Sequence, residues 1–134
     1  MNESDLHGKI YRRNFIEKNK IKFNNTRFHE DNYFNNLVLA CEPLIKKIFD
    51  FVYIYVYNEE SITNIQKEKE FERLEILLSN MRQLLDESKK RNCNREKIAY
   101  LMFIKVKYFN QIYLEFTKEQ KEEFKLWIKK YNLK

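Results

Sequence analysis

Residues 71–89, FERLEILLSNMRQLLDESK, decide the fold class. Apolar residues recur there every three or four positions, and this spacing places them along one face of an α-helix. Upstream, Thr63 and Gln66 stand three apart, the spacing of a capping box in which each side chain satisfies the other's backbone amide. We therefore expect a helix over about residues 64–89. Its apolar face consists of Phe71, Leu74, Leu77, Leu78, Met81, Leu84 and Leu85.

The same rhythm continues after a polar turn at residues 91–94. Asn94 is placed to cap the N-terminus of a helix over residues 95–116. Thr117 and Gln120 repeat the capping-box spacing and predict a last helix over residues 118–131. The apolar face of that last helix carries Phe124, Trp127, Ile128 and Tyr131.

Upstream of residue 64, a long apolar stripe predicts a helix over about residues 31–57. Two features oppose it: Pro43 removes a backbone donor in its interior, and Phe51 to Tyr57 alternate as in a strand. The stripe keeps its helical phase across both, so we expect either a kink at Pro43 or two helices separated there. Its members are Tyr33, Phe34, Leu37, Val38, Cys41, Leu44, Ile45, Ile48, Phe51, Val52, Tyr55 and Val56.

Length and composition agree with one helical domain. The chain has 134 residues, of which 43% are apolar, one is Gly and one is Pro. An all-β domain normally needs many more turn residues. We expect an all-α bundle of four to five mostly antiparallel helices over residues 30–134, preceded by a basic arm at residues 1–29. The excess of Lys, Asn, Ile, Phe and Tyr is typical of an AT-rich genome.

Three features that the sequence lacks indicate the cellular compartment of the protein. No apolar run approaches the ~20 residues of a membrane span, and no signal-peptide pattern opens the chain. Two cysteines cannot build a disulfide framework. We therefore expect a cytoplasmic, reduced protein without a transmembrane segment.

Positive charge is concentrated in the arm. The formal net charge is +6, and residues 9–27 carry seven basic side chains against the single acid Glu17. Aromatic residues at 11, 15, 23 and 28 lie between them, a mixture that suits phosphate pairing and base stacking, an acidic protein groove or an anionic membrane. The sequence leaves open whether the arm is partly disordered or docks its aromatics on the body. Its basic residues are Lys9, Arg12, Arg13, Lys18, Lys20, Lys22 and Arg27.

Residues for catalysis or metal binding are few. No glycine-rich phosphate loop exists, and His7 and His29 are the only imidazoles. Cys41 falls on an apolar stripe and is expected to pack as a small hydrophobe. Cys93 lies in a polar turn near Lys90, Arg91 and Arg95, where we expect an exposed thiol without function, the alternative being a reactive one. The sequence therefore predicts no enzyme, no metal and no cofactor.

Lys105 falls in the middle of an apolar stripe, between Leu101, Met102, Phe109 and Ile112. An unpaired buried ammonium is costly. Three alternatives remain open. The side chain extends along the helix to water, it pairs with a buried carboxylate such as Asp50 or Glu70, or it faces a pocket for a ligand or partner.

Surplus aromatic residues predict a binding surface. The helix over 95–116 is apolar on nearly all sides, which indicates either central burial or a second contact. Three more apolar residues fall on the polar back of the predicted 31–57 helix. Tyrosine in particular is favoured at protein interfaces. The candidate partner-binding residues are Leu39, Tyr53, Tyr57, Tyr100, Phe103 and Tyr108.

Two functions are therefore expected from different classes. The first is a non-enzymatic interaction module, a small subunit, adaptor or inhibitor that binds a protein partner or a second copy of itself. The alternative is a nucleic-acid-binding accessory protein that uses the basic arm together with lysines spaced along the last helix. Those lysines are Lys118, Lys121, Lys125 and Lys129.

Overall fold

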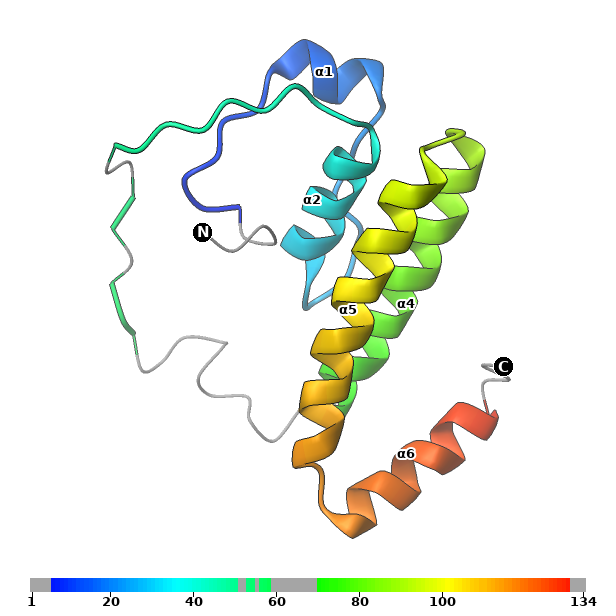
Figure 1. Cartoon of the computed structure of the whole chain (residues 1–134). Helices are drawn as coiled ribbons and strands as arrows, with labels where there is room; N and C mark the ends of the chain where they lie inside the picture. Colours follow the sequence, from blue (N-terminus) through cyan, green and yellow to red (C-terminus); the bar gives the residue numbers. More distant parts are fainter. Residues whose placement is uncertain (1–5, 51–52, 55, 59–69, 131–134) are drawn as a thin grey trace.

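The computed structural model describes residues 6–50, 53–54, 56–58 and 70–130. Within these ranges the secondary structure is helical, with no strand. The helices are α1 (Arg13–Lys18), α2 (Glu30–Ala40), α4 (Glu70–Lys90), α5 (Arg95–Glu115) and α6 (Lys118–Lys130) (Figure 1). The predicted all-α fold is confirmed.

Helices α4 and α5 form an antiparallel pair, because only a short turn joins them. Helix α2 packs against both, so that these three helices contact one another pairwise (Figure 1). Helix α6 turns away at the far end of α5, and α1 lies at the opposite end of the molecule. Since α4 and α5 have 21 residues each and α2 has 11, α2 spans about 16 Å against about 31 Å for each partner.

Two predicted helix starts are confirmed atom by atom. The Asn94 side chain accepts hydrogen bonds from the amides of Glu96 and Lys97, at 3.0 and 3.2 Å. The Thr117 amide donates to the Gln120 side chain at 2.9 Å, and the Gln120 amide donates back to the Thr117 hydroxyl at 3.2 Å. Thr63, Gln66 and Tyr131 lie outside the described residues, as do residues 64–69 of the predicted second helix.

The predicted helix over residues 31–57 is wrong beyond Ala40. Helix α2 ends there, and the described residues from Glu42 to Asn58 contain no helix. Glu42 adopts a left-handed conformation, with φ 51°, immediately before Pro43. A left-handed residue closes a helix, and the ring of a following proline disfavours helical geometry at the residue before it. Pro43 therefore neither kinks a helix nor separates two: it follows the end of one.

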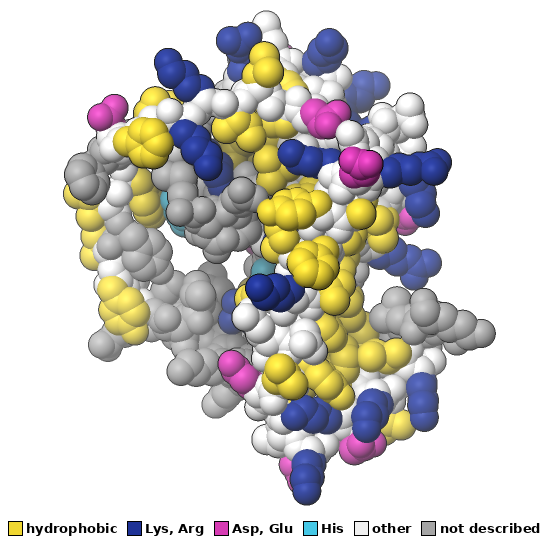
Figure 2. All heavy atoms as spheres, in the orientation of Figure 1, with side chains coloured by type: hydrophobic (Ala, Val, Ile, Leu, Met, Phe, Trp, Pro, Cys, Tyr) yellow, Lys and Arg dark blue, Asp and Glu magenta, His cyan; other side chains and the backbone are white. Residues whose placement is uncertain are grey.

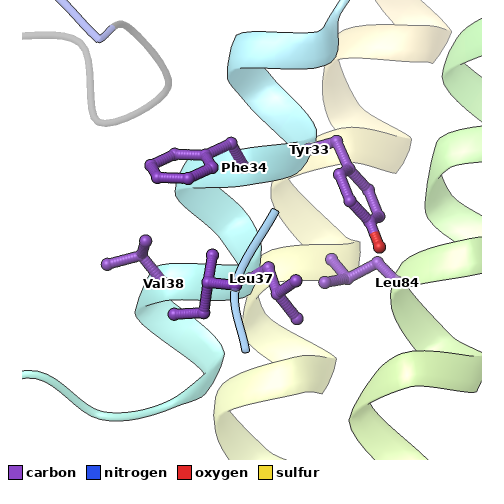
Figure 3. Close-up of a cluster of buried hydrophobic side chains, with 6 residues drawn as sticks. Tyr33, Phe34, Leu37, Val38 and Leu84 are labelled. Carbon is purple, nitrogen blue, oxygen red and sulfur yellow. The ribbon is translucent and has the colours of Figure 1, made fainter. Parts of the chain in front are cut away.

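Among the described residues, the core comprises three clusters of buried side chains. The first joins Tyr33, Phe34, Leu37 and Val38 of α2 to Leu84 of α4 and to Ile21 of the arm. Figure 3 shows Tyr33 reaching from α2 toward Leu84. The second, at the other end of the pair, is half aromatic and contains Leu74, Leu77, Phe116 and Phe124, with Trp127 packed against them. The third, Ala40, Ile98 and Leu101, connects the end of α2 to α5.

The described part of the arm packs on the body. Ile21 and Phe28 are buried, and Phe23 stacks on Phe34 of α2 with ring centroids 4.2 Å apart. The Arg91 guanidinium, at the end of α4, donates to the carbonyls of Asn19 and Lys20. The arm therefore supplies one side of the first cluster.

Burial predicts unequal effects at two adjacent leucines of α4. Leu84 is 2% exposed and Leu85 is 36% exposed. We expect Leu84→Ala to lower the free energy of unfolding by about 2–5 kcal/mol because it leaves a cavity. Leu85→Ala is the matched control and should cost under about 1 kcal/mol. Urea denaturation measures both, and equal losses would contradict the position of the core.

Candidate protein-interaction surface

Helix α5 has two apolar faces. One face enters the core: Ile98 and Leu101 are buried, and Met102, Phe109, Ile112 and Tyr113 pack against core clusters. The other face lies at the surface. Tyr100 is 55% exposed, Phe103 67% and Val106 54%, and Leu114 is exposed two turns farther along.

These four residues, Tyr100, Phe103, Val106 and Leu114, form what we call the α5 surface. Their spacing of three, three and eight residues keeps them on one side of the helix. Figure 2 shows hydrophobic side chains at the surface along this side of the molecule, with Lys and Arg side chains around them. Central burial of α5, one of the two alternatives from the sequence, is therefore not what the structure shows for this face.

The six predicted partner-binding residues do not form one surface. Tyr100 and Phe103 belong to the α5 surface. Tyr108 is 39% exposed and its ring meets the edge of His29, with centroids 6.4 Å apart. Leu39 is half-buried and packs against the third core cluster.

The prediction that places Tyr53 and Tyr57 with Leu39 on the back of one helix is wrong, because that helix ends at Ala40. Both tyrosines lie in irregular chain and are exposed, and Tyr53 stacks on His7 with ring centroids 4.6 Å apart.

The irregular segment that follows α2 carries exposed apolar side chains for which the sequence predicts a core position. Unlike the apolar residues of α2, these residues do not pack against α4 and α5. The periodic stripe therefore predicts which side chains share a face, but it does not predict whether another element packs on that face. The exposed members of the stripe are Leu44, Ile45, Ile48 and Val56; Phe49 and Ile54, which lie off the stripe, are exposed as well.

Polar side chains that the sequence analysis missed are buried around α2. Asn35, Asn36 and Asn80 are buried. Asn80 receives a hydrogen bond from Asn24 of the arm at 2.6 Å and donates to the carbonyl of His29 at 3.2 Å. Buried amides need such partners. Because Asn is abundant throughout the sequence, its composition did not distinguish these buried asparagines from the exposed ones.

Lys105 lies in this polar interior and is 6% exposed. The alternative that its side chain extends to water is therefore wrong. It lines a cavity of about 10 Å³ with Asn32, Asn36 and Asn80, room for about one water molecule and not for a ligand. Asp50 is exposed, and the side chain of Glu70 lies outside the described part of the chain.

His29 closes the same interior at the start of α2, where it adopts a left-handed conformation. Burial and, to a smaller extent, the positive charges of Arg73 and Lys105 together lower its pKa to about 4, while Asp31 opposes the shift. The imidazole is therefore neutral at pH 7.

The two cysteines are both half-buried, and each packs against a core cluster. Cys41 is half-buried against the first cluster, in agreement with its predicted role as a small hydrophobe. Cys93 is also half-buried, packed against the third cluster, so the expectation of an exposed thiol is wrong. No group of His, Cys, Asp and Glu among the described residues could hold a metal ion.

The two predicted basic groups lie at opposite ends of the molecule, since one surrounds α1 and the other lies on α6 (Figure 1). Arg13 pairs with Glu17, and Lys125 pairs with Glu122, both at 2.7 Å. Lys121 donates to the carbonyl of Leu114 at 3.2 Å. Lys9 is half-buried; the exposed members are Arg12, Lys18, Lys20, Lys22, Arg27, Lys118 and Lys129.

The chain matches no family model, no curated protein and no solved structure. Within the described residues, no helix combines the length and apolar character needed to cross a membrane.

The neutral imidazole of His29 predicts a pH dependence of stability. Its folded pKa lies below the ordinary 6.5, so the unfolded chain binds more protons between pH 6.5 and 4, and stability falls as the pH is lowered through that window. A shift to about 4 corresponds to a loss of about 3 kcal/mol.

We expect His29→Asn to remove most of this loss, because Asn tolerates the left-handed conformation and does not titrate. Urea unfolding at pH 7.0 and 4.5 measures it, with His7→Asn as the control variant. A His29→Asn protein that loses as much stability as the wild type would contradict the assignment.

Proposed function

We propose that this protein is a non-enzymatic protein–protein interaction module that binds its partner, or a second copy of itself, through the α5 surface. The observation that carries the proposal is the exposure of Tyr100, Phe103 and Val106 on a regular helix whose opposite face is anchored in the core.

The anchoring matters for binding. Because the backbone of α5 is already folded, a partner that covers this face does not have to order it, which lowers the cost of binding. Aromatic residues in such positions supply much of the binding energy at protein interfaces. Lys107 and Asn110, on the same side of α5 between Val106 and Leu114, are exposed as well, so the α5 surface mixes apolar and polar groups, as non-obligate interfaces do.

The test compares three full-length proteins. Tyr100→Ser/Phe103→Ser removes the aromatic centre at exposed positions, so the fold should be retained. Leu126→Ser is the matched control, because Leu126 is 66% exposed but lies on α6. We expect the double variant to weaken association at least tenfold, about 1.4 kcal/mol, and the control to leave it unchanged.

Two measurements report that association. Sedimentation velocity over a range of concentrations detects self-association, and capture from nuclease-treated lysate of the native cell, quantified by mass spectrometry, detects other proteins. A wild type that stays monomeric, and that retains no protein in a manner dependent on Tyr100 and Phe103, would overturn the proposal.

The second candidate function is nucleic-acid binding, supported by the exposed cations around α1. Arg12, Lys18 and Lys22 are exposed, whereas Ile21 and Phe28 in the same arm are buried. Deleting the arm would therefore damage the core, so charge removal at exposed positions is the cleaner change.

This candidate predicts that Arg12→Ser/Lys18→Ser/Lys22→Ser weakens binding to a single-stranded oligonucleotide. The slope of log K against log[salt] should become shallower by roughly 0.7 for each phosphate that the variant no longer neutralises. Fluorescence anisotropy measures both quantities. No binding by the wild type at about 50 mM salt would exclude this function.

A further inference from the structure

Two cysteines that are far apart in the sequence meet where α2 ends. Cys41 is the C-terminal cap of α2, and its amide donates to the carbonyls of Leu37 and Val38 at 3.3 and 3.1 Å. Cys93 lies in the turn between α4 and α5, and its amide donates to the carbonyl of Ser88 at 2.9 Å. Both backbones are therefore held by the helix ends to which they belong.

Contacts on either side bring the two positions together. The Asn94 side chain donates to the Glu42 carboxylate at 3.2 Å, so the residues directly after the two cysteines are hydrogen-bonded. Cys93 packs against the cluster that contains Ala40, the residue directly before Cys41.

The two thiols differ in their surroundings. Burial raises the pKa of the Cys41 thiol, and the charge of the nearby Cys93 raises it further, against the opposing effect of Arg91. Cys93 instead forms part of the wall of a surface pocket of about 300 Å³. Lys89 and Arg95 line the same pocket and give it positive charge.

We propose that Cys41 and Cys93 are a reversible modification site that closes to an intramolecular disulfide by exchange with a small anionic disulfide of the glutathione type. The pocket admits the reagent beside Cys93, and Cys41 is the resolving thiol behind it. This inference is independent of the α5 surface.

The chemistry is two successive thiol–disulfide exchanges. The Cys93 thiolate attacks one sulfur of oxidised glutathione, the reagent's S–S bond breaks, and one glutathione thiolate leaves. Cys41 then loses its proton to water and attacks the Cys93 sulfur, which releases the second glutathione. Two protein thiols are oxidised, and one glutathione disulfide is reduced to two thiols.

Closure would fasten the end of α2 to the α4–α5 turn. The bond would enclose residues 42–92 in one loop, and a loop of that length restricts the unfolded chain strongly. It would also fix the point from which the exposed apolar segment after α2 departs.

The experiment uses the full chain, reduced and then equilibrated with oxidised and reduced glutathione at pH 8. Alkylation and intact mass spectrometry should show a species about 2 Da lighter than the dithiol, and peptide mapping should join Cys41 to Cys93. We expect the melting temperature of this species to rise by roughly 10 °C.

Single variants test the order of attack. Cys41→Ser should stop at a stable glutathione adduct on Cys93, because it lacks the resolving thiol, while Cys93→Ser should acquire an adduct far more slowly. A wild type that accumulates glutathione adducts or intermolecular dimers without the lighter species would overturn the proposal. An unchanged or lower melting temperature for the disulfide form would overturn it as well, because the bond would then distort the native geometry.

Discussion

The end of helix α2 at Ala40, enforced by Glu42 and Pro43, is the constraint on which the rest of the structure depends. Proline has no amide hydrogen to donate and restricts the residue before it, and Glu42 turns the chain out of the helix with a positive φ. A left-handed conformation is unfavourable for a residue with a Cβ. The hydrogen bond from Asn94 to Glu42 stabilises it here and at the same time joins the end of α2 to the start of α5.

The short length of α2 determines which part of the α4–α5 pair it covers. It spans about half the length of the α4–α5 pair, so its apolar residues are buried over one part of that pair. The arm completes this part through Ile21 and through the guanidinium of Arg91, which holds two arm carbonyls. At the other end of the α4–α5 pair, the aromatic residues of α6 pack in the second core cluster. The outer face of α5 is left to solvent, and the proposed interaction follows from that exposure.

The sequence predicts α5 and α6 closely because their signals are local. Asn94 and the Thr117/Gln120 pair cap the helices that follow them, and the apolar spacing of Leu74, Leu77 and Leu84 marks the buried face of α4. The segment after Pro43 could not be predicted in this way. An apolar stripe of helical period predicts which side chains share a face, but their burial also needs a second element that packs on that face. Leu44 and Ile48 of the stripe are exposed, so α4 and α5 do not cover them.

The candidate sites depend still more on tertiary structure. Tyr100 and Phe103 could be singled out because they lie off the main stripe of their helix. Tyr53 and Tyr57 could not be placed, since their helix does not exist. The buried asparagines have no periodic signature, and the proximity of Cys41 to Cys93 arises from the packing of α2 on α5.

Amide hydrogen exchange followed by NMR tests the central constraint most directly. We expect slow exchange for the amides of residues 34–41, which are hydrogen-bonded within α2 or at its end, and fast exchange for the amides of residues 44–50. Uniformly slow exchange from residue 34 through residue 50 would show one continuous helix. It would contradict the end of α2 before Pro43 and the irregular course of the segment that follows it.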